Sequence, residues 1–443
     1  MTDGTGTAQS HSLQARGSFR LVIDRQFGAL FWGKLLGGAG TWIHSVVAAI
    51  VVFAATESAL WVGLVSVVQF TPQLALGPLS GKWADHGNVG LQLILGRALC
   101  IVGSISIAVY FYAAGEPAGV RGASVVLAGS FIAGLGYVVG GPAQQSIVPL
   151  LIRPGELSKA MALNSLPLPL SRIVGPAVGA VVAVQFGAGH GFLLAGLTNV
   201  MFIVLLLLAA LPKGVVQAED TDFSVRAAFR HVSQDRTLLL LLLVVAATGI
   251  ASEPAITLAP TFADELDAGS VMVGQVTGSF GVGAMFGYVV MSAAMRRHSQ
   301  QRLAQVGLGL MAVSSAALAF TESIVLTLML FALLGVGFMC SNTTATTLIL
   351  QRVPPGLRGR VMALWFVAFV GARPFAAALG GALADASSRA TPMLLSAALL
   401  VLLLAVFGLS KVDFSRQAQL GLVPTQILPS RAQPDLKEPR ASA

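Results

Sequence analysis

Residues 153–180 read RPGELSKAMALNSLPLPLSRIVGPAVGA, and residues 354–381 read PPGLRGRVMALWFVAFVGARPFAAALGG. The second stretch follows the first by 201 residues, and several glycines, one proline, a Met-Ala-Leu triplet and one arginine recur in register. The recurring pairs, in and just before these stretches, are Gly134/Gly335, Gly136/Gly337, Pro154/Pro355, Gly155/Gly356, Met161/Met362, Ala162/Ala363, Leu163/Leu364, Arg172/Arg373 and Gly179/Gly380. Chance would give far fewer matches, so we interpret the chain as two related halves.

The beginning of each half repeats at a slightly different spacing. At a shift of 211 residues, the coinciding pairs are Asp24/Asp235, Arg25/Arg236, Gly38/Gly249 and Gly63/Gly274. One loop accounts for the difference between the two shifts, because the connection AAGEPAGVRGAS at 113–124 is much longer than its counterpart FTES at 320–323. The repeat therefore covers most of both halves.

Composition identifies the chain as a membrane protein. Of its 443 residues, 55% are hydrophobic and only 10% are charged, with a mean hydropathy of +0.80, whereas soluble domains carry about 25% charged residues. This argues against a water-soluble enzyme, and the scattered basic residues do not form the stripe expected of a nucleic-acid surface. We find no catalytic, metal-ligand or cofactor constellation, so we expect no enzyme activity, no cofactor and no metal.

Twelve apolar stretches are long enough to cross the hydrocarbon core, which needs about 20 residues. They lie at 27–55, 59–81, 90–113, 122–148, 158–186, 190–211, 237–262, 271–294, 302–320, 324–350, 359–384 and 391–410. They lack the alternation of barrel strands, and an open sheet would leave backbone groups unsatisfied in lipid. We predict an all-α membrane protein with twelve transmembrane helices in two pseudo-symmetric six-helix bundles.

Polar segments divide the chain into five predicted parts. These are an N-terminal segment at 1–26, a first bundle at 27–212, a linker at 213–236, a second bundle at 237–410 and a tail at 411–443. With both termini in the cytoplasm, cytoplasmic segments hold 22 of the 27 Lys and Arg, which agrees with the positive-inside rule. Arg outnumbers Lys by 21 to 6, which suggests a GC-rich bacterial genome, and we expect the protein to lie in a bacterial inner membrane.

Among the ionisable residues of the predicted spans we single out five, namely Lys34, His44, Arg172, Glu253 and Arg373. A charge at mid-bilayer costs at least about 2.5–3.5 kcal/mol on insertion scales, so each is a candidate functional residue. A carboxyl group balanced between burial and a nearby arginine can bind and release a proton as its surroundings change. We therefore predict that Glu253, with Arg172 and Arg373, couples the protein's activity to protons.

Structural interpretations of the same residues remain open. Glu253 precedes Pro254 and could simply cap a helix break, and His44 could be a packing residue. An arginine stays protonated at these depths, so each of the two must find a carboxylate, carbonyl groups or an anionic ligand. Because one glutamate faces two arginines and Lys34, the interior is net positive and favours an anionic or acceptor-rich cargo.

Polar residues in the spans complete the predicted substrate cavity. Together with Lys34 and His44, the candidates are Gln69, Gln73, Tyr137, Gln144, Gln145, Asn164, Asn342, Thr343, Thr346 and Trp365. Polar groups inside membranes usually face the bundle rather than lipid, although hydrogen bonds between helices explain many of them.

The chain resembles the major facilitator superfamily, and within it the third drug:proton antiporter family, which includes macrolide-efflux and enterobactin-exporter-like proteins. The resemblance covers residues 20–410 and rests on the twelve-span pattern, on GPLSGKWAD at 77–85, and on the segments 153–180 and 354–385. It implies alternating access, in which two bundles rock around a site near the middle of the bilayer.

Two motifs of this resemblance imply gating residues. Gly81 and Asp85 match the superfamily signature after the second helix, which implies a conformational latch, although the basic residues that normally follow are absent. Gly175, Pro176 and Gly179 match the core of the antiporter signature, while Ser171 replaces another of its glycines. These three residues serve either as a gating hinge or as a packing face.

Taken together, the sequence predicts a proton-coupled exporter of a small organic molecule such as a drug or siderophore. The expected partners are this molecule, protons and the lipid bilayer, and we expect a monomer that binds no nucleic acid. No phosphate-binding loop of the G-x-x-x-x-G-K-[ST] type occurs, so an ion gradient is the expected energy source. The alternatives are an importer with the same fold, and a membrane receptor or scaffold without transport activity.

Overall fold

The computed structural model describes residues 17–115, 119–153, 156–209, 230, 232–295, 297–353 and 358–409, and every regular element in them is a helix. The helices of the first half are α1 (Ser18–Val22), α2 (Phe27–Thr56), α3 (Ala59–His86), α4 (Val89–Ala114), α5 (Gly119–Ser146), η1 (Val148–Leu151), α6 (Leu157–Asn164), α7 (Pro167–Phe186) and α8 (Ala188–Leu208). Those of the second half are α10 (Arg236–Ser252), α11 (Pro254–Thr257), α12 (Ala259–Glu265), α13 (Val271–Ala294), α14 (Gln300–Leu318), α15 (Ile324–Arg352), α16 (Arg358–Ala386) and α17 (Ala390–Leu409).

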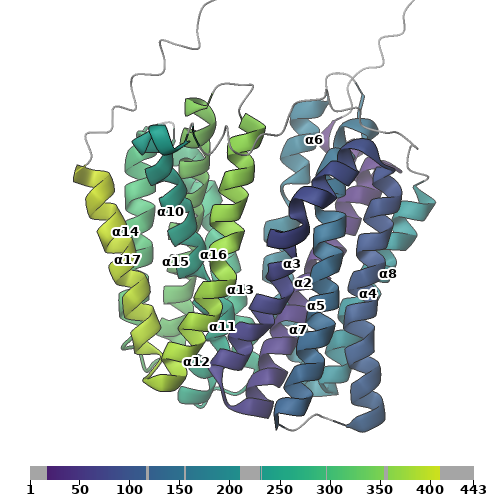
Figure 1. The fold of residues 1–443 in the computed structure, drawn as a ribbon, viewed down its shortest axis with the longest axis horizontal. Helices are drawn as coiled ribbons and strands as arrows, with labels where there is room; N and C mark the ends of the chain where they lie inside the picture. Colours follow the sequence, from purple (N-terminus) through teal and green to yellow (C-terminus); the bar gives the residue numbers. More distant parts are fainter. Residues whose placement is uncertain are drawn as a thin grey trace, which may run out of the picture.

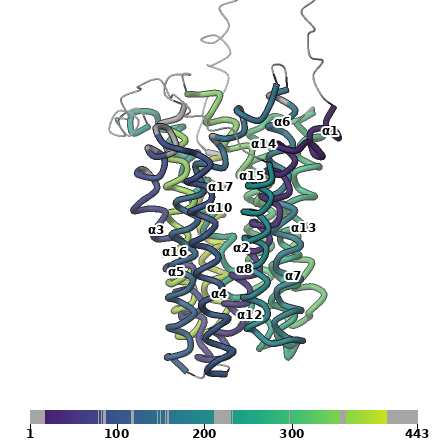
Figure 2. The backbone as a smooth tube through the Cα atoms, turned by 90° about the vertical axis from the view of Figure 1, so that its right-hand side faces the viewer, coloured from purple at the N-terminus to yellow at the C-terminus, as the bar shows by residue number. Residues whose placement is uncertain are grey.

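The two halves form two helical bundles that stand side by side (Figure 1). Helix α1 and the last residues of α17 lie at one end of the molecule, which we call the termini end, and α12 lies at the opposite end (Figures 1 and 2). The predicted linker lies almost entirely outside the described residues, as does the tail. The predicted all-α membrane fold with two pseudo-symmetric bundles is confirmed.

Eleven of the described helices are long and apolar enough to cross a membrane. The remaining predicted span, 302–320, corresponds to α14, whose first turn carries Gln300, Gln301 and Arg302 and makes the helix less apolar. Helix α14 packs along α15 and α17, just as α4 packs along α5 and α8 in the other half. Its place in the bundle is therefore that of a spanning helix.

Glycine contacts inside each bundle repeat at the two shifts found in the sequence. A Cβ placed on Gly136 would lie 2.5 Å from the carbonyl oxygen of Gly96, and one on Gly337 would lie 2.6 Å from that of Gly307. Gly96 and Gly307 are related by the shift of 211 residues, and Gly136 and Gly337 by the shift of 201. Helices α4 and α5 therefore approach each other in the same way as α14 and α15.

The contact between the two halves obeys the same relation. A Cβ placed on Gly63 of α3 would collide with the carbonyl oxygen of Ala377 in α16, and one on Gly274 of α13 would lie 2.6 Å from that of Pro176 in α7. Figure 2 shows the two helix pairs, α3 with α16 and α7 with α13, at opposite edges of the interface. Both glycines lie toward the opposite end, so the halves pack backbone to backbone there.

Two predicted spans are interrupted instead of continuous. The span 158–186 is divided into α6 and α7, with Pro167 opening α7, and the span 237–262 is divided into α10, α11 and α12, with Pro254 opening α11. A proline has no amide hydrogen and clashes with the carbonyl four residues earlier, so a helix readily restarts at it. The second interruption lies directly beside Glu253.

A carboxylate joins the two halves at the opposite end. Asp385, near the end of α16, accepts hydrogen bonds from the backbone amides of Ala59 at 2.7 Å and Leu60 at 3.0 Å, and from the hydroxyl of Ser58. These groups form the N-terminus of α3, where the helix dipole also favours a negative charge. Asp385 therefore caps a helix of the other half and favours the closed arrangement of this end.

Equivalent aspartates begin the first helix of each bundle. Asp24 accepts hydrogen bonds from the amides of Gln26 and Phe27 at 3.1 Å, and Asp235 accepts them from Thr237 at 2.9 Å and Leu238 at 3.3 Å. These two aspartates are one of the pairs in the sequence repeat. Their recurrence is explained by the need to satisfy the free amides of a helix N-terminus.

Asp235 also forms an ion pair with Arg352 at the end of α15. Burial tends to raise the pKa of Asp235, but its hydrogen bond and charge interaction with Arg352 and the two amide bonds hold the pKa below its ordinary value of 3.8. We expect Asp235→Asn to lower the free energy of unfolding by about 1 kcal/mol, because asparagine still caps the helix but leaves Arg352 without the carboxylate.

The acid dependence of this effect follows from the lowered pKa. The stabilisation by Asp235 is complete above its unfolded-state pKa and is lost as the pH falls through the lower folded-state value. Thermal unfolding of the purified protein should therefore separate wild type from Asp235→Asn at pH 7, and the two should come together once the pH falls below the folded-state pKa of Asp235. An equal difference at both pH values would contradict this account.

Candidate functional site

Three of the predicted ionisable residues lie near one another between the two halves, with Arg172 close enough to interact electrostatically with the other two. Glu253 lies at the break between α10 and α11, Arg373 lies on α16, and Arg172 lies on α7. Glu253 is 1% exposed, and its Oε2 accepts a hydrogen bond from Nε of Arg373 at 2.7 Å. We call Arg172, Glu253 and Arg373 the central charged cluster.

The helix break holds Glu253 in place. Residues 251–260 are all buried, and the hydroxyl of Thr277 on α13 donates to the carbonyl of Ala255 at 2.8 Å. Pro254 has no amide hydrogen, so no helical bond can form at that position. The carboxylate therefore sits on an irregular but well-packed piece of backbone.

Arg172 has aromatic neighbours instead of a carboxylate. Its guanidinium carbon lies 4.8 Å from the ring centre of Trp42, 4.3 Å from that of Phe280 and 5.7 Å from that of Phe338. Trp42 belongs to the same half, whereas Phe280 and Phe338 belong to the other. Cation–π attraction can hold a guanidinium in such a position without neutralising its charge.

Arg373 has a similar relation to the interface. Besides its bond to Glu253, its guanidinium carbon lies 5.4 Å from the ring centre of Phe70 on α3 and 5.7 Å from that of Phe369. Each arginine thus reaches an aromatic ring in the opposite half, Arg172 toward α13 and Arg373 toward α3. A movement of the halves would change the surroundings of both.

Several polar atoms of the central charged cluster are buried without a hydrogen-bond partner among the described residues. They are Oε1 of Glu253, Nη2 of Arg373, and Nε and Nη2 of Arg172. Such atoms carry a desolvation cost, and their concentration at one place is typical of functional sites rather than of structural ion pairs. This is the only place in the described residues where predicted proton-coupling residues come together.

A second polar group lies within the first bundle. Nζ of Lys34 donates to Oδ1 of Asn164 at 2.7 Å, and Nδ2 of Asn164 donates to Oε1 of Gln145 at 3.1 Å. This chain links α2, α6 and α5, and it brings together three residues that were predicted for the substrate cavity. Gln144 is the neighbouring, partly buried residue on α5.

Gln69 and Tyr137 form a further contact in the same bundle. The hydroxyl of Ser45 donates to Oε1 of Gln69 at 3.3 Å, and the hydroxyl of Tyr137 lies near Thr41 and Gln69. Gln73 lies one turn further along α3 and is partly buried.

The second bundle contributes a polar patch on α15 and α16. The indole of Trp365 donates to the hydroxyl of Thr346 at 2.9 Å, and the ring stacks on Phe369 with centroids 5.2 Å apart. Thr343 and Asn342 are partly buried on the same helix as Thr346. Phe369 connects this patch to Arg373.

His44 is placed inside the first bundle rather than between the halves. It is fully buried, and its two ring nitrogens lie 2.9 Å from the hydroxyls of Ser104 and Ser130. In this conformation both nitrogens are used to connect α2 with α4 and α5. This geometry agrees with the packing interpretation of His44.

The antiporter-type motif packs against two neighbouring helices. A Cβ on Gly175 would lie 2.8 Å from the carbonyl oxygen of Ala39, and one on Gly179 would lie 3.0 Å from the Cα of Ile43, both on α2. Pro176 turns its carbonyl toward α13 of the other half. The motif thus forms a close packing face, and a hinge role stays a prediction.

The predicted latch after the second span is only partly described. Gly81 lies in α3 with open space around it, while the side chain of Asp85 lies outside the described part of the structure. The latch role of these two residues stays a prediction.

Sequence reasoning missed Arg97. This residue is 4% exposed on α4, its Nη1 donates to Oδ1 of Asn199 on α8 at 3.2 Å, and its guanidinium carbon lies 5.2 Å from the ring centre of Phe202. It had been counted with the cytoplasmic positive charges. Its position well inside the predicted span 90–113 was the available signal.

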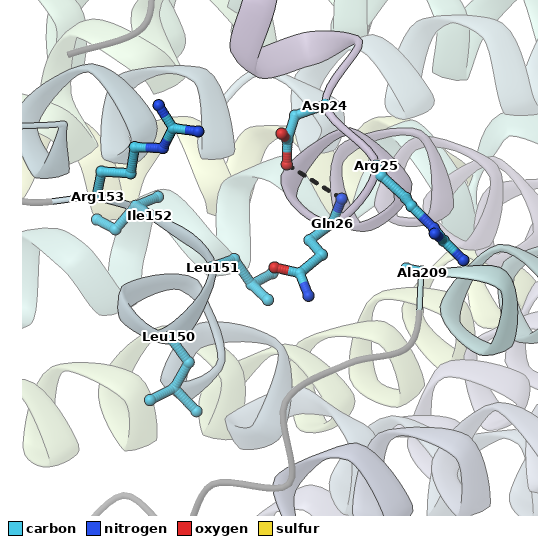
Figure 3. A pocket seen from close by; sticks show the side chains of 8 residues that line it. All are labelled: Asp24, Arg25, Gln26, Leu150, Leu151, Ile152, Arg153 and Ala209. Atoms are coloured by element: carbon cyan, nitrogen blue, oxygen red, sulfur yellow. Dashed lines mark hydrogen bonds between the residues drawn. The ribbon is translucent and has the colours of Figure 1, made fainter. Parts of the chain in front are cut away.

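A cavity of about 420 Å³ opens at the termini end of the first bundle. Figure 3 shows Asp24, Arg25, Gln26 and Arg153 on its wall, together with Leu150, Leu151, Ile152 and Ala209. None of the predicted substrate-cavity residues lines it. Arg25 is engaged with the carbonyl oxygen of Leu208 at 3.0 Å, so we do not assign the functional site here.

Comparisons with known proteins agree with this architecture. A family model described as a transmembrane secretion effector matches residues 18–437, and no curated protein matches the sequence. Among solved structures, a transporter of the POT family in complex with a thioalcohol-conjugated peptide has a TM-score of 0.71 at 11% identity, covering 86% of this chain and 94% of that one.

Two bacterial structures are similar as well. A homologue of the iron transporter ferroportin in an inward-facing state has a TM-score of 0.68 at 18% identity, covering 88% of this chain and 98% of its own. A homologue of the human lysosomal transporter Spinster, also inward-facing and unoccupied, has a TM-score of 0.67 at 17% identity, covering 88% and 96%. At these identities the similarity shows the fold alone.

Proposed function

Since the chain belongs to the transmembrane secretion effector family of the major facilitator superfamily, we propose that it is a secondary active exporter that exchanges a small organic molecule for protons. That it is a membrane transporter of this type follows from the family and the fold. The direction, the coupling ion and the class of cargo are the proposed part. Macrolides and siderophores remain the first cargo classes to test, because of the sequence resemblance.

One observation carries the proposal of proton coupling. Glu253 is a buried carboxylate at a helix break between the two halves, bonded through one oxygen to Arg373 and without a partner for the other among the described residues. Such a group can exchange its ion-pair partner for a proton when the surroundings change. Alternating access supplies that change, because the halves move relative to each other.

The proposed orientation places the termini end in the cytoplasm. The excess of Lys and Arg on cytoplasmic segments supports this orientation. Close backbone packing at Gly63 and Gly274, and the cap by Asp385, lie at the opposite end. The arrangement is therefore that of a transporter closed toward the outside, in a bacterial inner membrane with both termini in the cytoplasm.

Uptake by proteoliposomes under opposite pH gradients tests the proposal. The protein is reconstituted, and uptake of labelled erythromycin and enterobactin is measured with the vesicle interior either more acidic or more alkaline than the medium. Exchange predicts uptake only with an acidic interior, because protons leave as the molecule enters. Uptake driven by an acidic exterior would instead establish symport, and gradient-independent uptake would exclude proton coupling.

A further inference from the structure

Arg172 carries a positive charge whose hydrogen-bond donors are only partly satisfied. Its Nε and Nη2 are buried and have no hydrogen-bond partner among the described residues. Because a guanidinium does not lose its proton, the charge persists in a medium of low dielectric constant. Three aromatic rings surround the guanidinium carbon, but Nε and Nη2 still have no hydrogen-bond acceptor among the described residues.

The two unpartnered nitrogens belong to one edge of the guanidinium group. Nε and a terminal nitrogen on the same side present parallel N–H bonds, and this fork matches the two oxygens of a carboxylate. A lone acceptor such as a backbone carbonyl would satisfy only one of them. The two unsatisfied N–H donors of Arg172 therefore fit a planar anion with two oxygens, such as a carboxylate.

The internal repeat shows that the first half lacks the carboxylate that the second half has at the equivalent position. Arg172 and Arg373 are equivalent at the shift of 201 residues, and Trp42 and Glu253 are equivalent at the shift of 211. In the second half this pair of positions forms the ion pair Arg373–Glu253. In the first half Trp42 stands where the carboxylate would be, and Arg172 stacks on its ring at 4.8 Å.

Glu253 does not supply the missing charge in this conformation. Its Oε2 is bonded to Arg373, and the central charged cluster contains two arginines for one glutamate. No other aspartate or glutamate of the described residues forms an ion pair with Arg172. Among the described residues Arg172 thus has no carboxylate partner, and a carboxylate carried by a bound molecule would supply one.

We infer that Arg172 binds the carboxylate of the transported molecule, and that this molecule is an organic acid whose apolar, ring-containing body lies against Trp42, Phe280 and Phe338. The inference rests on the proposed transport function and specifies its substrate class. Rings from both halves enclose the guanidinium, so a carboxylate bound there contacts both halves and senses their movement. Binding requires the arginine edge to turn out from between the rings.

Equilibrium dialysis of the purified full chain with 1-naphthoate tests this inference. The neutral probe 1-naphthamide has the same ring system without the charge, and naphthylmethylammonium carries the opposite charge. We expect saturable binding of naphthoate, at least about tenfold tighter than either other probe. Arg172→Gln should reduce naphthoate affinity at least about tenfold, while Arg97→Gln, which removes another buried arginine of the same bundle, should change it less than threefold.

A complementary pair of variants does not depend on removing the arginine. Trp42→Glu installs the carboxylate that the second half possesses at this position, and Trp42→Gln has the same shape without the charge. The Glu variant should bind naphthoate at least about tenfold more weakly than the Gln variant, because Arg172 is then neutralised from within. Equal affinities in these two variants would overturn the inference even if Arg172→Gln fails to fold.

These experiments distinguish a failure of the carboxylate-site inference from a failure of the proposed export function. Dialysis uses no pH gradient, so equal binding of naphthoate and naphthamide refutes the carboxylate site while leaving proton-driven uptake of erythromycin or enterobactin intact. Conversely, selective naphthoate binding through Arg172 without gradient-driven uptake of any probe would support the site and refute the proposed export.

Discussion

Glu253→Gln is expected to reduce proton-driven uptake to the level of protein-free vesicles. Glutamine has nearly the shape of glutamate and can still accept the hydrogen bond of Arg373 through its amide oxygen, but it does not titrate. The variant should therefore fold and bind its cargo while losing the only buried carboxylate that we place between the halves. The measurement is the uptake of erythromycin or enterobactin, whichever the wild type transports, into vesicles with an acidic interior.

Exchange without a gradient separates the loss of coupling from the loss of folding. Vesicles loaded with unlabelled probe should still exchange it for labelled probe through Glu253→Gln at a rate similar to wild type. Asp264→Asn is the matched control, because Asp264 is an exposed carboxylate on α12, just after the same predicted span. Its proton-driven uptake should remain within about twofold of wild type. Full gradient-driven uptake by Glu253→Gln would show that another group carries the proton.

The second large effect is expected from enlarging the glycines between the halves. Gly63→Leu and Gly274→Leu each place a side chain against the backbone of the other half, where even a Cβ has no room. Backbone carbonyls cannot move aside as a flexible side chain would, so the opposite end cannot close as it does here. We expect transport to be abolished in the double variant, although each bundle should still fold.

Distances between spin labels can show the cause directly. Labels on cysteines at Ala54 and Ser388, in a chain with Cys100 and Cys340 replaced by serine, report the separation of the halves at the opposite end. The double variant should lengthen this distance and broaden its distribution. Gly77→Leu and Gly278→Leu, on the same two helices, are the controls, because a Cβ finds open space at Gly77 and only ordinary contact at Gly278. A short distance in the double variant would refute this explanation.

The sequence was sufficient to predict the membrane spans, which depend on local composition, and the two related halves, which follow from the repeat. The spans followed from hydropathy, and the repeat paired Gly63 with Gly274, which the structure places in equivalent contacts between the halves. The break at Pro254 was one of the two interpretations of Glu253, whereas the break before Pro167 lies inside a span predicted as continuous, because a membrane segment is recognised by its average apolarity. A break changes that average little, although proline marks where it can occur.

Contacts between distant residues were beyond the reach of that reasoning. The sequence identified Glu253 and Arg373 as exceptional, but it did not reveal that they form an ion pair while Arg172 has none. Positions 42 and 253 are equivalent in the repeat, but Trp42 packs against Arg172 in the first half, whereas Glu253 pairs with Arg373 in the second. Asp385 was missed because an acidic residue at the end of a span is ordinary until its partners on α3 are known.

The contacts of Asp385 bear on how well the membrane holds its proton gradient. A proton-coupled carrier that opened spontaneously to the outside would let protons leak back and dissipate the gradient that other machines maintain. By joining α16 to the first turn of α3, Asp385 stabilises the arrangement in which the opposite end is closed, and under the proposed proton exchange this closure limits such a leak. The hydrogen bonds between Asp385 and α3 must then break before the transporter can open to the outside and release its cargo.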